Sequence, residues 1–75
     1  MVRLLVPLSS LEVFAEAGRL QSFRRAAIAL SLTTSAVSQS IRKLEDRLGC
    51  RLFERLGNRV LLSEEGSRLL REVEI

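Results

Sequence analysis

The stretch Thr33–Gly49 reads TTSAVSQSIRKLEDRLG, and the rest of the chain is organised around it. At about 100° per residue, spacings of four, three and four place one apolar stripe along a helix. The members of this stripe are Val37, Ile41, Leu44 and Leu48. Short hydrogen-bonding side chains and one guanidinium stand opposite it, with Thr34 at the edge: Thr34, Ser35, Ser38, Gln39 and Arg42. We expect the stripe to pack on a small core. Taken alone, the polar face fits either a binding surface or ordinary solvent-exposed surface.

A shorter helix is expected directly before this stretch, from Phe23 to Leu30. Ser22 is a suitable N-cap, because its hydroxyl can accept a hydrogen bond from an orphan amide of the first turn. Arg24 and Arg25 lie in that turn, where the helix dipole favours acids. A docked anion would explain them, and two exposed arginines without a partner are the alternative. A short helix, a tight turn and a longer amphipathic helix fit a helix-turn-helix, and also an ordinary helical hairpin.

Two further helices are expected nearer the ends of the chain. Apolar residues recur at three and four over Leu8 to Ala17, and Gly18 is the expected stop of this first helix. Ser63 is an N-cap followed by acids in the first turn of a last helix, as the dipole prefers. One side of this last helix is apolar through Leu69, Leu70 and Val73. Because so short a helix covers little of a core, we expect it to need a second copy of the chain.

Between Gly49 and Ser63, two short strands are expected, joined by a turn at Gly57 and Asn58. Glycine and asparagine tolerate the left-handed conformations that tight hairpin turns need. Such a hairpin after an amphipathic helix is a wing, with Arg59 at its tip and Arg55 nearby. The alternative is a mere connector with a charged tip.

Composition limits the classes of function. The chain of 75 residues is one small domain, and it contains one cysteine and no histidine. An internal disulfide is therefore excluded, a metal site is not expected, and Cys50 is interpreted as a small buried hydrophobe. Nothing in the sequence provides for general acid–base or nucleophilic catalysis. The opening apolar run is too short for a membrane span and lacks a signal cleavage pattern, so we expect a cytosolic protein without a membrane partner.

Basic charge is concentrated in the middle of the chain. The net charge is +3, but residues 19 to 59 hold nine bases and three acids, and both flanks are net acidic. This distribution suggests an anionic partner for the middle segment. On charge alone, a solvated arginine-rich surface fits about as well.

The order and spacing of five segments resemble the N-terminal DNA-binding domain of LysR-type transcriptional regulators, from about Leu8 to Leu70. These segments are LEVF (11–14), SFRRAAIAL (22–30), TTSAVSQSIRKLEDRLG (33–49), RLFER (51–55) and LSEEG (62–66). The resemblance implies a mostly α winged helix-turn-helix, with a three-helix core, a small β-hairpin wing and a C-terminal linker helix. It implies a DNA-binding domain over 1–62 and the start of a linker and dimerisation helix over 63–75. We expect the chain to lack the C-terminal effector-binding domain of the family and interpret it as an isolated or naturally truncated DNA-binding domain.

The same resemblance implies sequence-specific binding to double-stranded DNA, with helix 34–48 in the major groove. Carried over by position, the base-facing residues are Thr34, Ser35, Ser38 and Gln39, with Arg42 reaching a phosphate or a base edge. Backbone and wing contacts fall on Ser22, Arg24, Arg25, Arg55 and Arg59. Glutamine is frequent in the family at position 34 and arginine at position 39, so the departures at Thr34 and Gln39 are expected to influence specificity.

The resemblance further implies a bacterial, cytoplasmic transcription regulator that uses no cofactor. It implies a homodimer, paired through the linker helix at Leu69, Leu70 and Val73, on a pseudo-palindromic operator. A small-molecule inducer would act only through the absent domain. The main alternative function is a protein-interaction module on the same frame. That alternative predicts apolar residues on the outer face of helix 34–48, whereas this face is polar.

Overall fold

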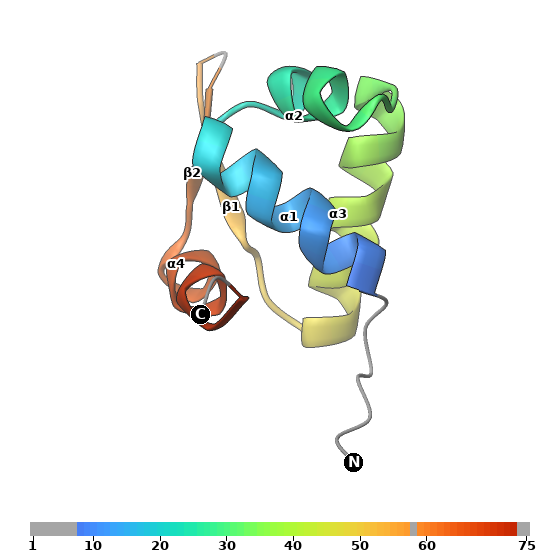
Figure 1. Cartoon of the computed structure of the whole chain (residues 1–75). Coiled ribbons are helices and arrows are strands. Elements are labelled where there is room, and N and C mark those ends of the chain that lie inside the picture. Colours follow the sequence, from blue (N-terminus) through green and yellow to red (C-terminus); the bar gives the residue numbers. More distant parts are fainter. Residues whose placement is uncertain (1–7, 58, 74–75) are drawn as a thin grey trace.

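The computed structural model describes residues 8–57 and 59–73. Its elements are α1 (Leu8–Leu20), α2 (Phe23–Leu30), α3 (Thr34–Leu48), β1 (Phe53–Leu56), β2 (Arg59–Leu62) and α4 (Glu64–Val73) (Figure 1). The two strands form one antiparallel hairpin. The expected order of four helices and a hairpin, and with it the winged helix-turn-helix fold, is confirmed. Asn58 of the expected turn lies outside the described residues.

The boundaries of α2 and α3 follow from their end residues. The Ser22 hydroxyl accepts a hydrogen bond from the backbone N–H of Arg25 at 3.0 Å. The Thr33 hydroxyl does the same for the N–H of Ala36, also at 3.0 Å. α3 ends at Gly49, whose φ of 72° lies in the left-handed region that favours glycine. Both predicted N-caps and the predicted end of α3 are therefore confirmed.

α1 is longer than the sequence suggested. It runs through Gly18 to Leu20, so the expected stop at Gly18 is wrong. Gly18 is buried, and a Cβ atom there would lie 3.3 Å from Leu62 Cδ2 and 3.4 Å from Leu70 Cδ2. This glycine allows β2 and α4 to pack closely on α1. The chain turns instead at Gln21, whose φ is 55°.

The core lies where α1, α2, α3 and the hairpin meet, and α1 lies between α3 and α4 (Figure 1). The three aromatic rings of the chain meet there. The Phe53 ring lies edge to face with Phe14 at 5.6 Å between centroids and with Phe23 at 5.2 Å. Such pairs add about 0.5–1.5 kcal/mol each beyond the area that they bury. The largest fully buried side chains are Phe14, Leu44, Leu52 and Val37.

The backbone at Leu52 joins α3, the hairpin and α4. Its N–H donates to Glu45 Oε2 at 2.8 Å, and its carbonyl accepts from the N–H of Ser63 at 2.9 Å. The Ser63 hydroxyl donates to the carbonyl of Arg51 at 2.6 Å and accepts from the N–H of Gly66 at 3.0 Å. Ser63 is thus the predicted cap of α4 and also a tether to the strand. These bonds hold the hairpin at a defined position beside α3.

Candidate nucleic-acid interface

The outer face of α3 is polar over its first turns. Four of the side chains predicted to face a partner are exposed, namely Thr34, Ser35, Gln39 and Arg42. Ser38 is half-buried. The opposite side packs into the core through Val37, Ile41 and Leu44. Leu48 is 42% exposed, so the predicted apolar stripe does not include its last member.

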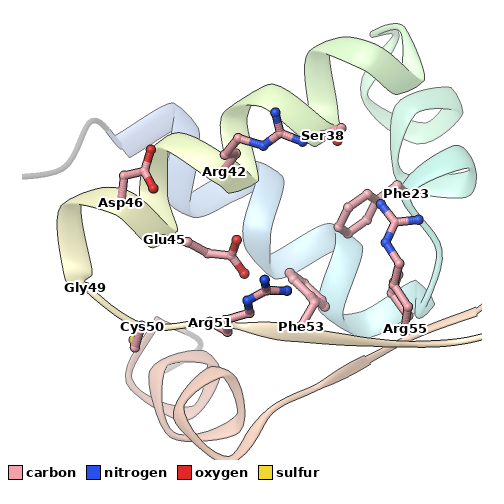
Figure 2. A pocket seen from close by; sticks show the side chains of 11 residues that line it. Phe23, Ser38, Arg42, Glu45, Asp46, Gly49, Cys50, Arg51, Phe53 and Arg55 are labelled. Carbon is pink, nitrogen blue, oxygen red and sulfur yellow. The ribbon is translucent and has the colours of Figure 1, made fainter.

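A groove of about 720 Å³ separates α3 from the strand β1 (Figure 2). Arg42 and Ser38 border it from α3, while Arg51 and Arg55 border it from the strand side. The rings of Phe23 and Phe53 belong to its lining, which also includes Glu45, Asp46, Gly49, Cys50 and Val60. Three guanidinium groups therefore face one hollow beside the polar face of α3. One of its two acids, Glu45, is already engaged by the N–H of Leu52.

Arg51 belongs to this groove, although the sequence reasoning did not single it out. In an extended segment, side chains two apart point to the same side. The alternation of Arg51, Phe53 and Arg55 therefore contained the signal, and all three line the groove. Figure 2 shows the Arg51 guanidinium pointing toward the Glu45 carboxylate on α3.

A second hollow of about 330 Å³ lies on the other flank of α3, beside α1. Gln39, Lys43 and Arg47 line it at a spacing of four, which places them on one side of the helix. The rest of the lining is Ser10, Ala36, Ser40 and Leu44. Lys43 and Arg47 were not among the predicted site residues, although their spacing from Gln39 contained the signal. The polar face of α3 thus has basic side chains along both flanks.

The start of α2 gathers the predicted residues Ser22, Arg24 and Arg25 around a third hollow, with Ile28. The Ser22 hydroxyl is used as the N-cap, and both arginines are exposed. The placement of two guanidiniums at a helix start is therefore as expected. Ile28 is 71% exposed, so this hollow has one apolar wall.

The hairpin directs its two predicted arginines, Arg59 at the tip and Arg55 nearby, to opposite faces. Arg55 pairs with Val60 across the strands, and Leu56 pairs with Arg59. Adjacent cross-strand pairs point to opposite faces of a hairpin. Arg55 accordingly lines the groove beside α3, whereas the Arg59 side chain donates to Gln21 Oε1 at 2.6 Å, at the end of α1.

The residues predicted to pair two chains lie on α4. Leu69, Leu70 and Val73 are all half-buried within this single chain. Leu69 and Leu70 pack against the core cluster, and Leu70 approaches Gly18 of α1. The apolar side of α4 is therefore partly used inside the chain, and part of each side chain remains accessible.

Two features of other kinds of protein are absent from the described residues. In residues 8–57 and 59–73, no three histidine, cysteine or acidic side chains cluster as metal ligands. Within the same ranges, no helix combines the length and the apolar character that crossing a membrane requires. The sulfur-bearing side chain of Cys50 is half-buried at the edge of the groove.

The family model for bacterial regulatory helix-turn-helix proteins of the lysR family matches residues 8–67. The chain belongs to the lysR family. The match covers α1, the helix-turn-helix, the hairpin and the start of α4, which are the elements that build the polar face and the basic hollows. The predicted family is therefore confirmed.

Individual lysR-family relatives agree with this assignment. The chain is 49% identical over 70 residues to the HTH-type transcriptional activator AmpR of Yersinia enterocolitica, covering 93% of this chain and 24% of the relative. It is 50% identical over 66 residues to the glycine cleavage system transcriptional activator of Escherichia coli K12, covering 88% of this chain and 22% of the relative. The chain thus spans about a quarter of the length of these relatives.

Solved structures show the same fold. The crystal structure of a BenM DBD/catB site 1 DNA complex has a TM-score of 0.88 to this chain at 30% identity, covering 92% of this chain and 77% of that one. A LysR-family transcriptional regulator from Eggerthella lenta has a TM-score of 0.83 at 31% identity, covering 89% and 96% of the two chains. The winged helix-turn-helix architecture is therefore shared with lysR-family members.

Proposed function

We propose that this chain is the DNA-binding part of a transcriptional regulator and binds double-stranded DNA in a sequence-specific way. The observation that carries the proposal is the exposed polar face of α3 between two basic hollows. Its relatives are transcriptional activators, and one neighbour of the same fold was solved with DNA. No catalytic activity is assigned to the chain.

The two hollows fit the borders of a major groove. A B-DNA major groove is about 12 Å wide, admits one α-helix and is bounded by a phosphate backbone on each side. With α3 in such a groove, Arg42, Arg51 and Arg55 would meet one backbone. Lys43 and Arg47 would meet the other backbone. Among the described residues, Glu45 and Asp46 line the groove beside α3, and the other acids lie on α1, β1 and α4.

Base recognition is assigned to the exposed face of α3. Thr34, Ser35 and Ser38 offer hydroxyl groups that can donate to or accept from base edges. Gln39 can form two hydrogen bonds with adenine, through its N6 and N7 atoms. Arg42, which also borders the groove, is assigned either a phosphate or a base edge.

Backbone positioning is assigned to the start of α2 and to the wing. Ser22, Arg24 and Arg25 lie at the start of α2, where the positive end of the helix dipole and the two guanidinium groups attract a phosphate. Ser22 contributes as the N-cap, because its hydroxyl accepts from the N–H of Arg25. Such contacts fix the register of a protein on DNA without reading sequence. Arg59 at the wing tip is assigned to the minor groove, since a narrow A·T-rich stretch attracts a guanidinium.

Dimerisation is assigned to α4, through the accessible parts of Leu69, Leu70 and Val73. In this assignment residues 1–62 form the DNA-binding domain and residues 63–75 begin a linker helix. Two copies related by a two-fold axis would place two α3 helices on a pseudo-palindromic operator, with half-sites spaced by the helical repeat. Any response to a small-molecule inducer is assigned to further chain of the kind that the longer relatives contain. The protein is assigned to the bacterial cytoplasm.

Selection of bound duplexes from a random pool, followed by salt titration on the selected duplex, tests the function. We expect one recurring two-fold symmetric motif. The logarithm of the affinity should fall with the logarithm of salt concentration by about 0.9 per phosphate neutralised. No enrichment, together with a binding isotherm that does not change with salt, would contradict DNA binding. Enrichment of a single asymmetric half-site would contradict only the dimer.

A further inference from the structure

Gln21 occupies an unusual position between α1 and α2. Its φ of 55° places a non-glycine residue in the left-handed region. Its backbone N–H donates to the carbonyl of Ala17 at 2.9 Å, which closes the end of α1. The rest of the residue is turned to the hairpin. Its carbonyl accepts from the N–H of Val60 at 3.4 Å, and its side-chain oxygen accepts from the Arg59 guanidinium at 2.6 Å.

These two contacts connect the wing tip to the helical body. Val60 is 7% exposed and anchors β2 in the core, while Leu56, the cross-strand partner of Arg59, is 62% exposed. The tip therefore has little packing of its own. Among the described residues, Gln21 is the hydrogen-bond partner of the Arg59 side chain. Without this bond, a long exposed arginine would sample many rotamers.

The bond leaves most of the guanidinium available. An arginine side chain carries five N–H donors in a planar fork, and one nitrogen is used at Gln21. The guanidinium keeps its positive charge, and its remaining N–H donors are held in a fixed orientation. An exposed hydrogen bond of this kind contributes little to folding, so its main consequence is the orientation of Arg59.

We propose that Gln21 is a positioning residue for the wing, holding the Arg59 guanidinium ready to enter the minor groove beside the site of α3. This inference rests on the proposed function of DNA binding. Because the Gln21 amide is neutral, it orients the Arg59 guanidinium without neutralising the positive charge. Gln21 thereby raises affinity for duplexes whose flank has a narrow A·T-rich minor groove.

The test uses the 75-residue chain and the selected duplex with either an A·T-rich or a G·C-rich flank. Gln21→Gly removes the side chain, keeps the backbone carbonyl and suits the positive φ, so the fold is retained. We expect Gln21→Gly to raise the Kd for the A·T-rich duplex by about two- to tenfold, which corresponds to ordering one long side chain. The preference for the A·T-rich over the G·C-rich flank should decrease at the same time. The midpoint temperature of thermal unfolding should stay the same or rise.

A double-mutant cycle with Arg59→Ala separates positioning from a general structural role. In the Arg59→Ala background, Gln21→Gly should have no further effect on the Kd. The isosteric Gln21→Glu keeps Arg59 in place but offsets its charge, so it should weaken binding and make the salt dependence shallower. An unchanged Kd in Gln21→Gly, or equal losses with and without Arg59, would overturn the positioning role while DNA binding stands. A wild-type chain that binds no duplex would overturn both.

Discussion

The carboxylate of Glu45 on α3 accepts a hydrogen bond of 2.8 Å from the backbone N–H of Leu52, seven residues further along the chain. Leu52 is 1% exposed, so this N–H has little access to water if the carboxylate is removed. A buried donor left without a partner costs about 1–3 kcal/mol. We therefore expect Glu45→Ala to lower the free energy of unfolding by about that amount, measured by urea denaturation.

The neighbouring acid supplies the control for this prediction. Asp46 is exposed and lines the same groove, so Asp46→Ala removes the same charge without uncovering a buried amide. Its effect should stay within about 0.5 kcal/mol. Equal urea midpoints for Glu45→Ala and the wild type would show that water replaces the carboxylate at Leu52.

Two glycines should respond differently to alanine. A Cβ at Gly66 would lie 2.1 Å from the backbone oxygen of Leu52, which cannot move without breaking the bonds around it. At Gly18, the nearest atoms are side-chain methyls at 3.3 Å or more, which can shift. Alanine is favoured over glycine in a helix by about 1 kcal/mol at both positions.

We expect Gly66→Ala to destabilise the fold by about 1–3 kcal/mol or more despite this preference, as overpacking does. Gly18→Ala should change stability by less than about 1 kcal/mol, since the gain in propensity offsets a small adjustment. Calorimetric or optical melting of the two variants compares them directly. A Gly66→Ala chain that melts with the wild type would mean that α4 can move away from Leu52.

Local chemistry was enough to predict most of the fold. Ser22, Thr33 and Ser63 act as N-caps, and Gly49 ends α3, because capping depends on residues within one or two turns. The prediction that α1 ends at Gly18 was wrong for a different reason. Gly18 has the residue type of a helix stop, but its role is set by Leu62 and Leu70, which reach it only after the chain has folded.

The candidate site shows the same division. The polar face of α3 follows from helical periodicity alone, whereas Arg51 lines the groove because the segment that leads from α3 into β1 returns beside that helix. The separation of Arg55 and Arg59 depends on strand register, which places neighbouring pairs on opposite faces. The bond between Gln21 and Arg59 joins residues 38 apart and has no local signal.

Arg51 provides a test of the groove beside β1. If this groove faces a phosphate backbone, Arg51→Gln should weaken binding to all duplexes alike and reduce the salt slope by about 0.9. Arg71→Gln is the control, because it removes the same charge from an exposed residue on α4 that lies outside the three hollows. Salt titrations of both variants by fluorescence anisotropy make the comparison. Equal losses would indicate an effect of net charge rather than a contact at the groove.

Gln39 and Lys43 lie one turn apart on the same flank of α3, yet they should affect recognition differently. Gln39 is exposed near the start of the helix and can form two hydrogen bonds with one base, so Gln39→Ala should cost about 1–3 kcal/mol on the selected site. The same variant should also lose the base preference at one position of each half-site. Lys43→Gln should weaken binding to every sequence and make the salt slope shallower, with the selected motif unchanged. Repeating the random-pool selection with each variant distinguishes these outcomes. A motif that keeps its full preference after Gln39→Ala would remove Gln39 from the base-reading surface.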